Sequence, residues 1–339
     1  MRRFCPDLHQ IIPGYSTSGF LRAGRTGMER GQVAETDVQE LVELAARSTD
    51  GLAASRKWVV SPAVCRRYLA AAASAAKPGA TAALPFLLRS ARWRDEQAVD
   101  AMLEDRPLLN FERSLRETML YEVWNDASGR PLMVERVGAW DLARLTRLVD
   151  ESPEQVVRAH ILVNERIRVR LDGGGGGADG DGGAFADGRA STADGGALAD
   201  RRAVLVFDLQ GLGVAHLACR SLLRLFGTLS SLDAAHFPDT VGTIVCIDAP
   251  RVFAALWATV SRLVAAGTRN KLLVYASTAR AEACGALREL CGATCLPSEL
   301  GGSRDHALPY HIDYGDRPGG VDTGDARGET AAWRSGGFD

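Results

Sequence analysis

Three short apolar segments between residues 203 and 276 constrain the fold of this chain most strongly. Residues 203–211, 243–250 and 272–276 are rich in apolar residues and have turn-forming residues at their ends. Segments of helical length separate them. Short apolar runs with this punctuation are typical of buried parallel strands that crossover helices connect. The sequence therefore predicts an α/β lobe with a mostly parallel sheet as its floor.

The segment at residues 251–266, between the second and third apolar runs, allows two interpretations. Its apolar residues recur at helical spacing and form one broad stripe. The first interpretation is a crossover helix that packs on the sheet as part of the core. The second is a gate helix whose apolar face closes a hydrophobic pocket. The gate residues would be Phe253, Leu256, Trp257 and Val260.

The residues that precede this lobe are predominantly helical. Residues 36–47, 63–76 and 84–103 combine apolar residues at helical spacing with start or stop signals. This pattern predicts a helical N-terminal region over residues 31–120, followed by the α/β lobe over residues 121–302.

Three further segments have compositions that do not favour a packed core. Residues 172–200 are rich in Gly, Ala and Asp, which predicts a flexible surface insertion within the lobe. Residues 303–339 predict a loosely ordered tail. Residues 1–30 predict an irregular N-terminus, and an organelle transit peptide stays open as the alternative.

Composition excludes several classes of function. The formal net charge of −2 argues against nucleic acid binding through phosphate neutralisation. No apolar stretch approaches the roughly 20 residues that span a bilayer. The seven Cys are odd in number and scattered, which suits a reducing compartment and predicts no zinc site.

The chain also lacks complete catalytic and cofactor motifs. The Gly-x-Ser-x-Gly motif of serine hydrolases is absent. Gly211 and Gly213 follow a predicted strand, but the third Gly of a dinucleotide fingerprint is missing. The sequence therefore predicts neither catalysis nor a cofactor nor a metal.

Several short motifs, in order, resemble those of the CRAL-TRIO lipid-binding domain family, which includes the yeast phosphatidylinositol transfer protein. A turn at residues 126–131 resembles the family's Asp-x-x-Gly-Arg-Pro, and residues 86–94 resemble its Arg-rich helical motif. The other five motifs lie in the lobe: Asp208-Leu209-Gln210-Gly211, Phe237-Pro238-Asp239-Thr240-Val241-Gly242, Ile247-Asp248-Ala249-Pro250, Gly267-Thr268-Arg269-Asn270-Lys271 and Leu300-Gly301-Gly302.

The resemblance implies a phosphoinositide headgroup site and no catalysis. In phosphatidylinositol-binding members, a Thr and a Lys, an acid after a Pro, and an Arg of the helical motif hold the headgroup. The matching residues here are Thr268, Lys271, Asp239 and Arg92. The strand hydroxyls that yeast-type members offer to phosphocholine have no counterpart at residues 203–205. The resemblance thus favours phosphatidylinositol over phosphatidylcholine, or a single ligand other than phosphatidylcholine.

Together, these features predict a non-enzymatic carrier that binds a phospholipid and transfers or presents it between membranes. Its partners would be the phospholipid and a transient membrane surface, and it would be cytoplasmic and peripheral at membranes. The alternative is an interaction or scaffold protein that retains the fold without the ligand. A lipid of defined mass bound to the purified protein would discriminate between the two.

Overall fold

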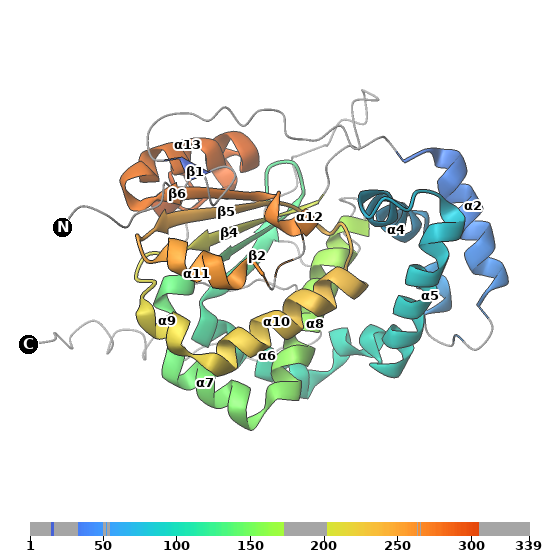
Figure 1. The fold of residues 1–339 in the computed structure, drawn as a ribbon, viewed down its shortest axis with the longest axis horizontal. Helices are drawn as coiled ribbons and strands as arrows, with labels where there is room; N and C mark the ends of the chain where they lie inside the picture. The colour runs from blue at the N-terminus through green and yellow to red at the C-terminus, as the bar shows by residue number, and fades with distance from the viewer. Residues whose placement is uncertain are drawn as a thin grey trace, which may run out of the picture.

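The computed structural model describes residues 15–16, 33–49, 52, 55–172, 202–262, 264 and 266–304. Helices from the N-terminal part lie to one side of a twisted sheet, and further helices cover both faces of that sheet (Figure 1). The predicted insertion lies outside the described residues except for Asp172, and so does most of the predicted tail and N-terminus. Among the described residues, no helix is long and apolar enough to cross a membrane.

Four N-terminal helices form a core of their own. Pro62 occupies the first turn of its helix, where a missing N–H costs nothing. Gly79 precedes the longest of the four helices and has a φ of 100°, which glycine adopts readily. Buried apolar residues from all four helices make one cluster. The helices are α2 (Glu35–Arg47), α3 (Arg56–Val59), α4 (Pro62–Ser74) and α5 (Ala80–Glu96).

A second group of helices connects this bundle to the sheet. Asp105 and Asp141 begin two of them by accepting a hydrogen bond from the backbone N–H three residues later. These helices share one apolar core, whose residues come from both sides of residue 120. The domain boundary that the sequence predicts at this residue stays a prediction. The elements are η1 (Val99–Glu104), α6 (Arg106–Met119), η2 (Val137–Ala139), α7 (Leu142–Glu151), α8 (Pro153–Asp172), α9 (Val214–Ala218) and α10 (Arg220–His236).

The sheet confirms the prediction of a mostly parallel floor. Its strand order is β1-β6-β5-β4-β3-β2, and only β2 runs antiparallel to its neighbour. The turn at Asp126 joins β2 to β3, as its carboxylate accepts from the N–H groups of Ser128 and Arg130. The strands are β1 (Tyr15–Ser16), β2 (Tyr121–Asn125), β3 (Pro131–Glu135), β4 (Ala203–Asp208), β5 (Val241–Ala249) and β6 (Leu272–Ala276).

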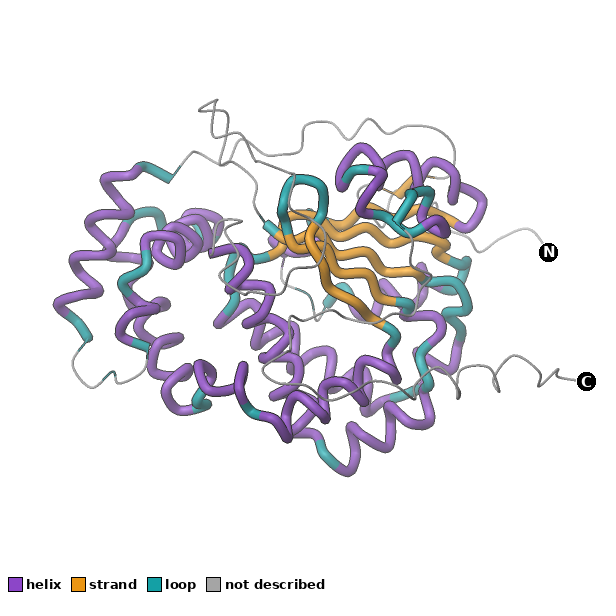
Figure 2. Tube along the Cα trace, turned by 180° about the vertical axis from the view of Figure 1, so that it is seen from behind, coloured by secondary structure: helices purple, strands orange, loops and turns teal. Residues whose placement is uncertain are grey.

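Alternating side chains divide the sheet into two faces. One face packs on α13 (Arg280–Cys291), which lies over the strands in the view from behind (Figure 2). The other face packs on α8 near β2 and β3, and on α11 (Phe253–Val260) near β5 and β6. The remaining short helices are α12 (Ala266–Arg269), η4 (Ser277–Ala279), η5 (Ala293–Cys295) and η6 (Ser298–Leu300).

The helix predicted over residues 251–266 is shorter in the structure. It covers only Phe253–Val260, and a turn separates it from the single helical turn Ala266–Arg269. The apolar stripe alone did not reveal this break, since Ser261 and Arg262 are compatible with a helix. The sequence also did not predict α6, α13 or β2.

Candidate functional site at the amino edge of the sheet

Three charged residues come together where the central parallel strands begin. Arg202, Asp239 and Lys271 each lie one or two residues before β4, β5 and β6. Parallel neighbours start at the same edge of a sheet, so these side chains converge. We call the group of Arg202, Asp239 and Lys271 the amino-edge cluster.

The cluster is a compact, partly buried arrangement of two cations and one anion. Asp239 Oδ1 lies 3.2 Å from Arg202 Nη1 and 3.8 Å from Lys271 Nζ. The Asp239 and Lys271 side chains are both 14% exposed. Lys271 Nζ also donates to the backbone carbonyl of Val241. The three side chains are thus held close together and are only partly exposed to solvent.

The turn that carries Asp239 is fixed from the N-terminal helices. The Trp93 ring of α5 stacks on the His236 ring at 3.9 Å between centroids, and Ser90 Oγ lies 3.0 Å from His236 Nδ1. Burial, assisted by Arg89, lowers the pKa of His236 to about 4, so the stacked ring is neutral at pH 7. Asp239 itself has a φ of 52°, a left-handed conformation that Asp tolerates better than most residues.

Thr268 lies in α12, one turn before Lys271. The backbone N–H of Lys271 donates to the Thr268 carbonyl at 3.0 Å, so the two residues share a tight turn. Arg269 Nη1 donates to the Ser261 carbonyl at 2.9 Å and ties this turn to the end of α11. The Thr268 side chain is half-buried.

Arg92 has a different setting from the other three predicted headgroup residues. It is exposed on α5. The buried arginine of this helix is Arg94, which is 2% exposed and makes two hydrogen bonds of 2.8 Å to the Glu165 carboxylate of α8. The structure therefore brings Asp239, Lys271 and the Thr268 turn together and leaves Arg92 on the surface. Arg202 joins the cluster although sequence reasoning missed it; its signal was a cation directly before the first apolar run.

The predicted gate helix lies against the sheet. Phe253 and Trp257 are 5% and 9% exposed, and their rings stack with centroids 6.2 Å apart. Both belong to one apolar cluster with Leu272 of β6. Val260 is half-buried, and the Leu256 side chain lies outside the described part of the chain. Packing of this kind fits a core helix and also the closed position of a gate.

Part of the sheet face beside α11 is incompletely covered. Met133, Leu205 and Phe207 point to the same face as α8 and α11, and each is only half-buried. We call these three side chains the apolar floor.

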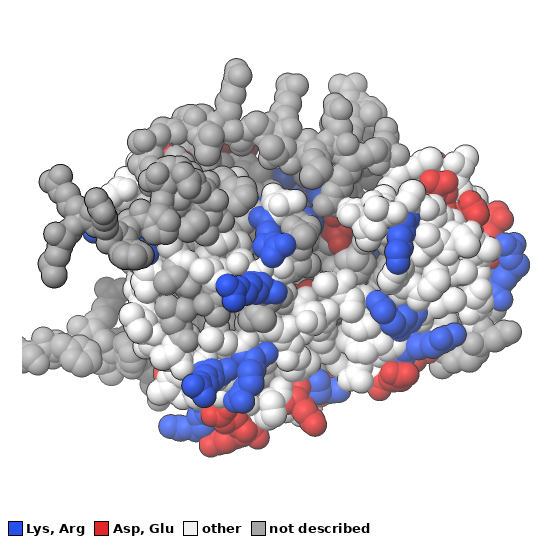
Figure 3. All heavy atoms as spheres, in the orientation of Figure 1, with Lys and Arg blue, Asp and Glu red and all other residues white. Residues whose placement is uncertain are grey.

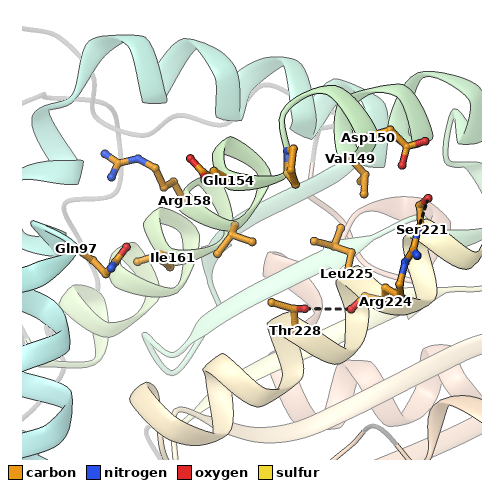
Figure 4. A pocket seen from close by; sticks show the side chains of 12 residues that line it. Gln97, Val149, Asp150, Glu154, Arg158, Ile161, Ser221, Arg224, Leu225 and Thr228 are labelled. Atoms are coloured by element: carbon orange, nitrogen blue, oxygen red, sulfur yellow. Dashed lines mark hydrogen bonds between the residues drawn. The ribbon is translucent and has the colours of Figure 1, made fainter.

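A groove of about 590 Å³ lies elsewhere, between α7, α8 and α10. Val149 and Leu225 point into it, while Arg158 points away (Figure 4). No residue of the apolar floor or of α11 lines it, so this groove is not the predicted hydrophobic pocket. Its lining is Gln97, Val149, Asp150, Pro153, Glu154, Val157, Arg158, Ile161, Ser221, Arg224, Leu225 and Thr228.

Among the residues that the structure describes, no three His, Cys, Asp or Glu side chains group as metal ligands.

Comparisons with known proteins agree with this fold. A model of the CRAL/TRIO domain matches residues 117–302. "Protein real-time" of Anopheles gambiae is 28% identical over 223 residues, which cover 64% of this chain and 28% of that protein. "Phosphatidylinositol/phosphatidylcholine transfer protein SFH12" of Arabidopsis thaliana is 23% identical over 215 residues, 62% of this chain and 35% of that protein.

The chain thus spans about a third of the length of these two relatives. The crystal structure of Sfh5 has a TM-score of 0.53 and 14% identity to this chain, covering 83% of this chain and 94% of its own. This likeness supports the fold.

Proposed function

Because this chain belongs to the CRAL/TRIO domain family, we propose that it binds a phospholipid of the phosphatidylinositol type and transfers or presents it between membranes. The observation that carries the proposal is the amino-edge cluster, at the edge of a sheet whose apolar floor is incompletely covered. The protein acts without catalysis, as a carrier at membrane surfaces.

The apolar floor suits the acyl chains of such a ligand. A diacyl lipid exposes roughly 30 methylenes, and each costs about 0.8 kcal/mol in water. Extraction from a bilayer therefore requires an apolar surface of matching size. Met133, Leu205 and Phe207 supply a part of such a surface, and α11 covers its neighbouring part. Movement of α11 would extend the floor and admit the lipid.

The amino-edge cluster suits the headgroup. Lys271 and Arg202 donate to phosphate oxygens, while Asp239 accepts hydrogen bonds from sugar-like hydroxyls. Ala203, which follows Arg202, offers no hydroxyl to a choline phosphate, so an inositol headgroup fits better.

The surface around α10, α11 and α12 is compatible with contact to a bilayer. On this face Lys and Arg side chains are scattered over a mainly uncharged surface, and acidic side chains lie mostly at its edges (Figure 3). Anionic lipids attract such a surface.

Replacing Lys271 by Ala tests the headgroup assignment. A charge-assisted hydrogen bond contributes about 1.5–3 kcal/mol, so phosphatidylinositol binding should weaken about ten- to a hundredfold. Thr268→Val should have a weaker effect, and the double variant should be less than additive if both groups hold one phosphate. The measurement is transfer of labelled phosphatidylinositol between vesicles.

Lys57→Ala is the matched control, because Lys57 is an exposed lysine on α3. It should transfer lipid as the wild-type chain does. Arg92→Ala shows whether that exposed arginine contributes to binding. Unchanged transfer in Lys271→Ala would remove the headgroup assignment. A purified protein that never carries a lipid in native mass spectrometry would favour the scaffold alternative instead.

A further inference from the structure

The groove between α7, α8 and α10 has an apolar floor that the fold itself holds in place. We call it the outer groove, and its volume is about 590 Å³. Val149 and Ile161 are 7% and 1% exposed and belong to the core that joins α6, α7, α8 and α10. Val157 and Leu225 pack against this core and are half-buried. Such a floor is formed before any ligand arrives, as binding surfaces usually are.

A corner between α7 and α8 forms one wall of the outer groove. α7 ends at Glu151, and Pro153 begins α8, where its missing N–H costs nothing. Asp150 and Glu154 lie on either side of this corner and line the groove together (Figure 4). Asp150 lies in the last turn of α7, where the helix dipole disfavours a carboxylate. This wall is therefore acidic, and a cation beside Asp150 would stabilise it.

The first half of α10 forms the opposite wall, which is basic. The residues that line the groove from this side are Ser221, Arg224, Leu225 and Thr228. α10 has no acid in its first turn, and Arg220 and Arg224 instead lie in its first two turns. The start of a helix disfavours cations. An anion beside Arg224 would therefore stabilise this wall.

The two walls do not neutralise each other. Within the part of the chain that the structure describes, Asp150, Glu154 and Arg224 form no ion pair. Arg158 also belongs to this groove, but it points away from it and lies 3.2 Å from Asp105 Oδ2 (Figure 4). An occupant with apolar side chains between a cationic and an anionic flank would pair both walls at once.

The outer groove fits a helix better than an extended segment. Its residues recur at helical spacing on both sides: Pro153, Val157 and Ile161 on α8, and Ser221, Leu225 and Thr228 on α10. Every residue that lines it belongs to a helix or directly follows one. An extended segment would find no free backbone groups to pair with there, whereas a helix satisfies its own. The two walls are about 10–12 Å long, which is about two turns of a helix.

We infer that the outer groove is a docking site for an amphipathic helix of a partner protein. The helix presents its apolar stripe to the floor, a flank with Lys or Arg to the acidic wall, and a flank with Asp or Glu to the basic wall. The inference goes beyond the proposed function and does not depend on it, because the outer groove shares no residue with the amino-edge cluster, the apolar floor or α11.

Four synthetic helical peptides test the inference on the full-length chain. Each has about 18 residues, since shorter isolated helices are marginally stable, and all carry the same leucine stripe. The two flanks of the stripe carry Lys on one and Glu on the other, Lys on both, Glu on both, or Gln on both. A helix that docks in the reverse direction exchanges its flanks, so the composition of the flanks is varied and not their order.

Fluorescence anisotropy of the labelled peptides measures their affinities. We expect the mixed peptide to bind about three- to tenfold more tightly than either peptide with a single charge sign, because each of these replaces an ion pair by a contact between like charges. The Gln peptide should also bind more weakly than the mixed peptide, since it forms no ion pair.

Reversing the charge of one wall is the sharper test, and the residues involved are exposed, so the fold should tolerate it. Arg224→Glu makes both walls acidic and should transfer the preference to the peptide with Lys on both flanks. Asp150→Lys combined with Glu154→Lys makes both walls basic and should favour the peptide with Glu on both flanks. Arg113→Glu is the matched control, because Arg113 is exposed on α6 outside the groove. It should keep the wild-type order of affinities.

Three outcomes would overturn the inference. Equal affinities of the four peptides for the wild-type chain would show that the charged walls select nothing. A lack of saturable binding by all four would show that the groove does not accept a helix. An order of affinities that stays the same in both charge-reversed variants would show that the peptides bind elsewhere on the chain.

Discussion

Replacing Arg94 by Ala should lower the free energy of unfolding by about 3–5 kcal/mol, because it breaks a buried salt bridge from one side. Arg94 donates to both oxygens of Glu165, whose side chain is only 1% exposed, and also contacts Asp100. Its guanidinium lies 4.6 Å from the centroid of the Trp58 ring. Without Arg94, Glu165 keeps Arg168 as a partner but loses its bidentate bond.

The same helix offers a matched control. Arg92 is exposed two residues earlier, so Arg92→Ala should change the free energy of unfolding by less than about 0.5 kcal/mol. Chemical denaturation of both variants measures the difference. Similar stability of the two variants would show that the salt bridge between α5 and α8 does not hold the bundle to the lobe.

This contrast also shows what the sequence could and could not predict about the site. Continuous apolar runs predicted β4, β5 and β6 well, because burial on both faces requires apolar residues at nearly every position. Which of two arginines faces inward is a different question. Arg94 is buried because it lies on the side of α5 that meets α8, and Arg92 lies on another side. The partner of Arg94, Glu165, is 71 residues further along the chain, so no local pattern reveals the contact.

The members of the amino-edge cluster also differ in how far the sequence predicts them. The motif resemblance located Asp239 and Lys271, since each lies beside a recognisable strand start. Arg202 carries no motif, and its contact with Asp239 depends on strand pairing that places Ala203 beside Val241. The stacking of Trp93 on His236 joins residues far apart in sequence, so no local pattern reveals it.

The length of α11 was overestimated for a related reason. An apolar stripe indicates which residues face the core, but it does not locate the end of a helix without a cap or a breaker. Arg269 bonds the Ser261 carbonyl in the structure, which satisfies an acceptor at the helix end from outside the helix. A core helix and a closed gate would occupy the same position on the sheet. The two interpretations of α11 therefore differ in the free energy that is needed to detach it.

Replacing both Phe253 and Trp257 by Ala should therefore separate these interpretations. Each truncation removes about 3–5 kcal/mol of packing from a core position. If α11 is a gate, it can detach while the rest of the fold stays intact. The two substitutions can then lower the global free energy of unfolding by no more than the free energy of opening α11. We expect amide hydrogen exchange to accelerate strongly within residues 253–260 and much less in the strands, together with faster release of bound lipid.

Leu287→Ala supplies the reference for a core position on the other face of the sheet. Leu287 is fully buried between α13 and the strands, and its truncation should cost about 2–5 kcal/mol of global stability. If α11 is a gate, the double variant loses less global stability than this single substitution, although it removes two aromatic rings. A larger loss than in Leu287→Ala, with exchange accelerated evenly over the sheet, would establish α11 as a core crossover helix and leave lipid entry to another part of the lobe.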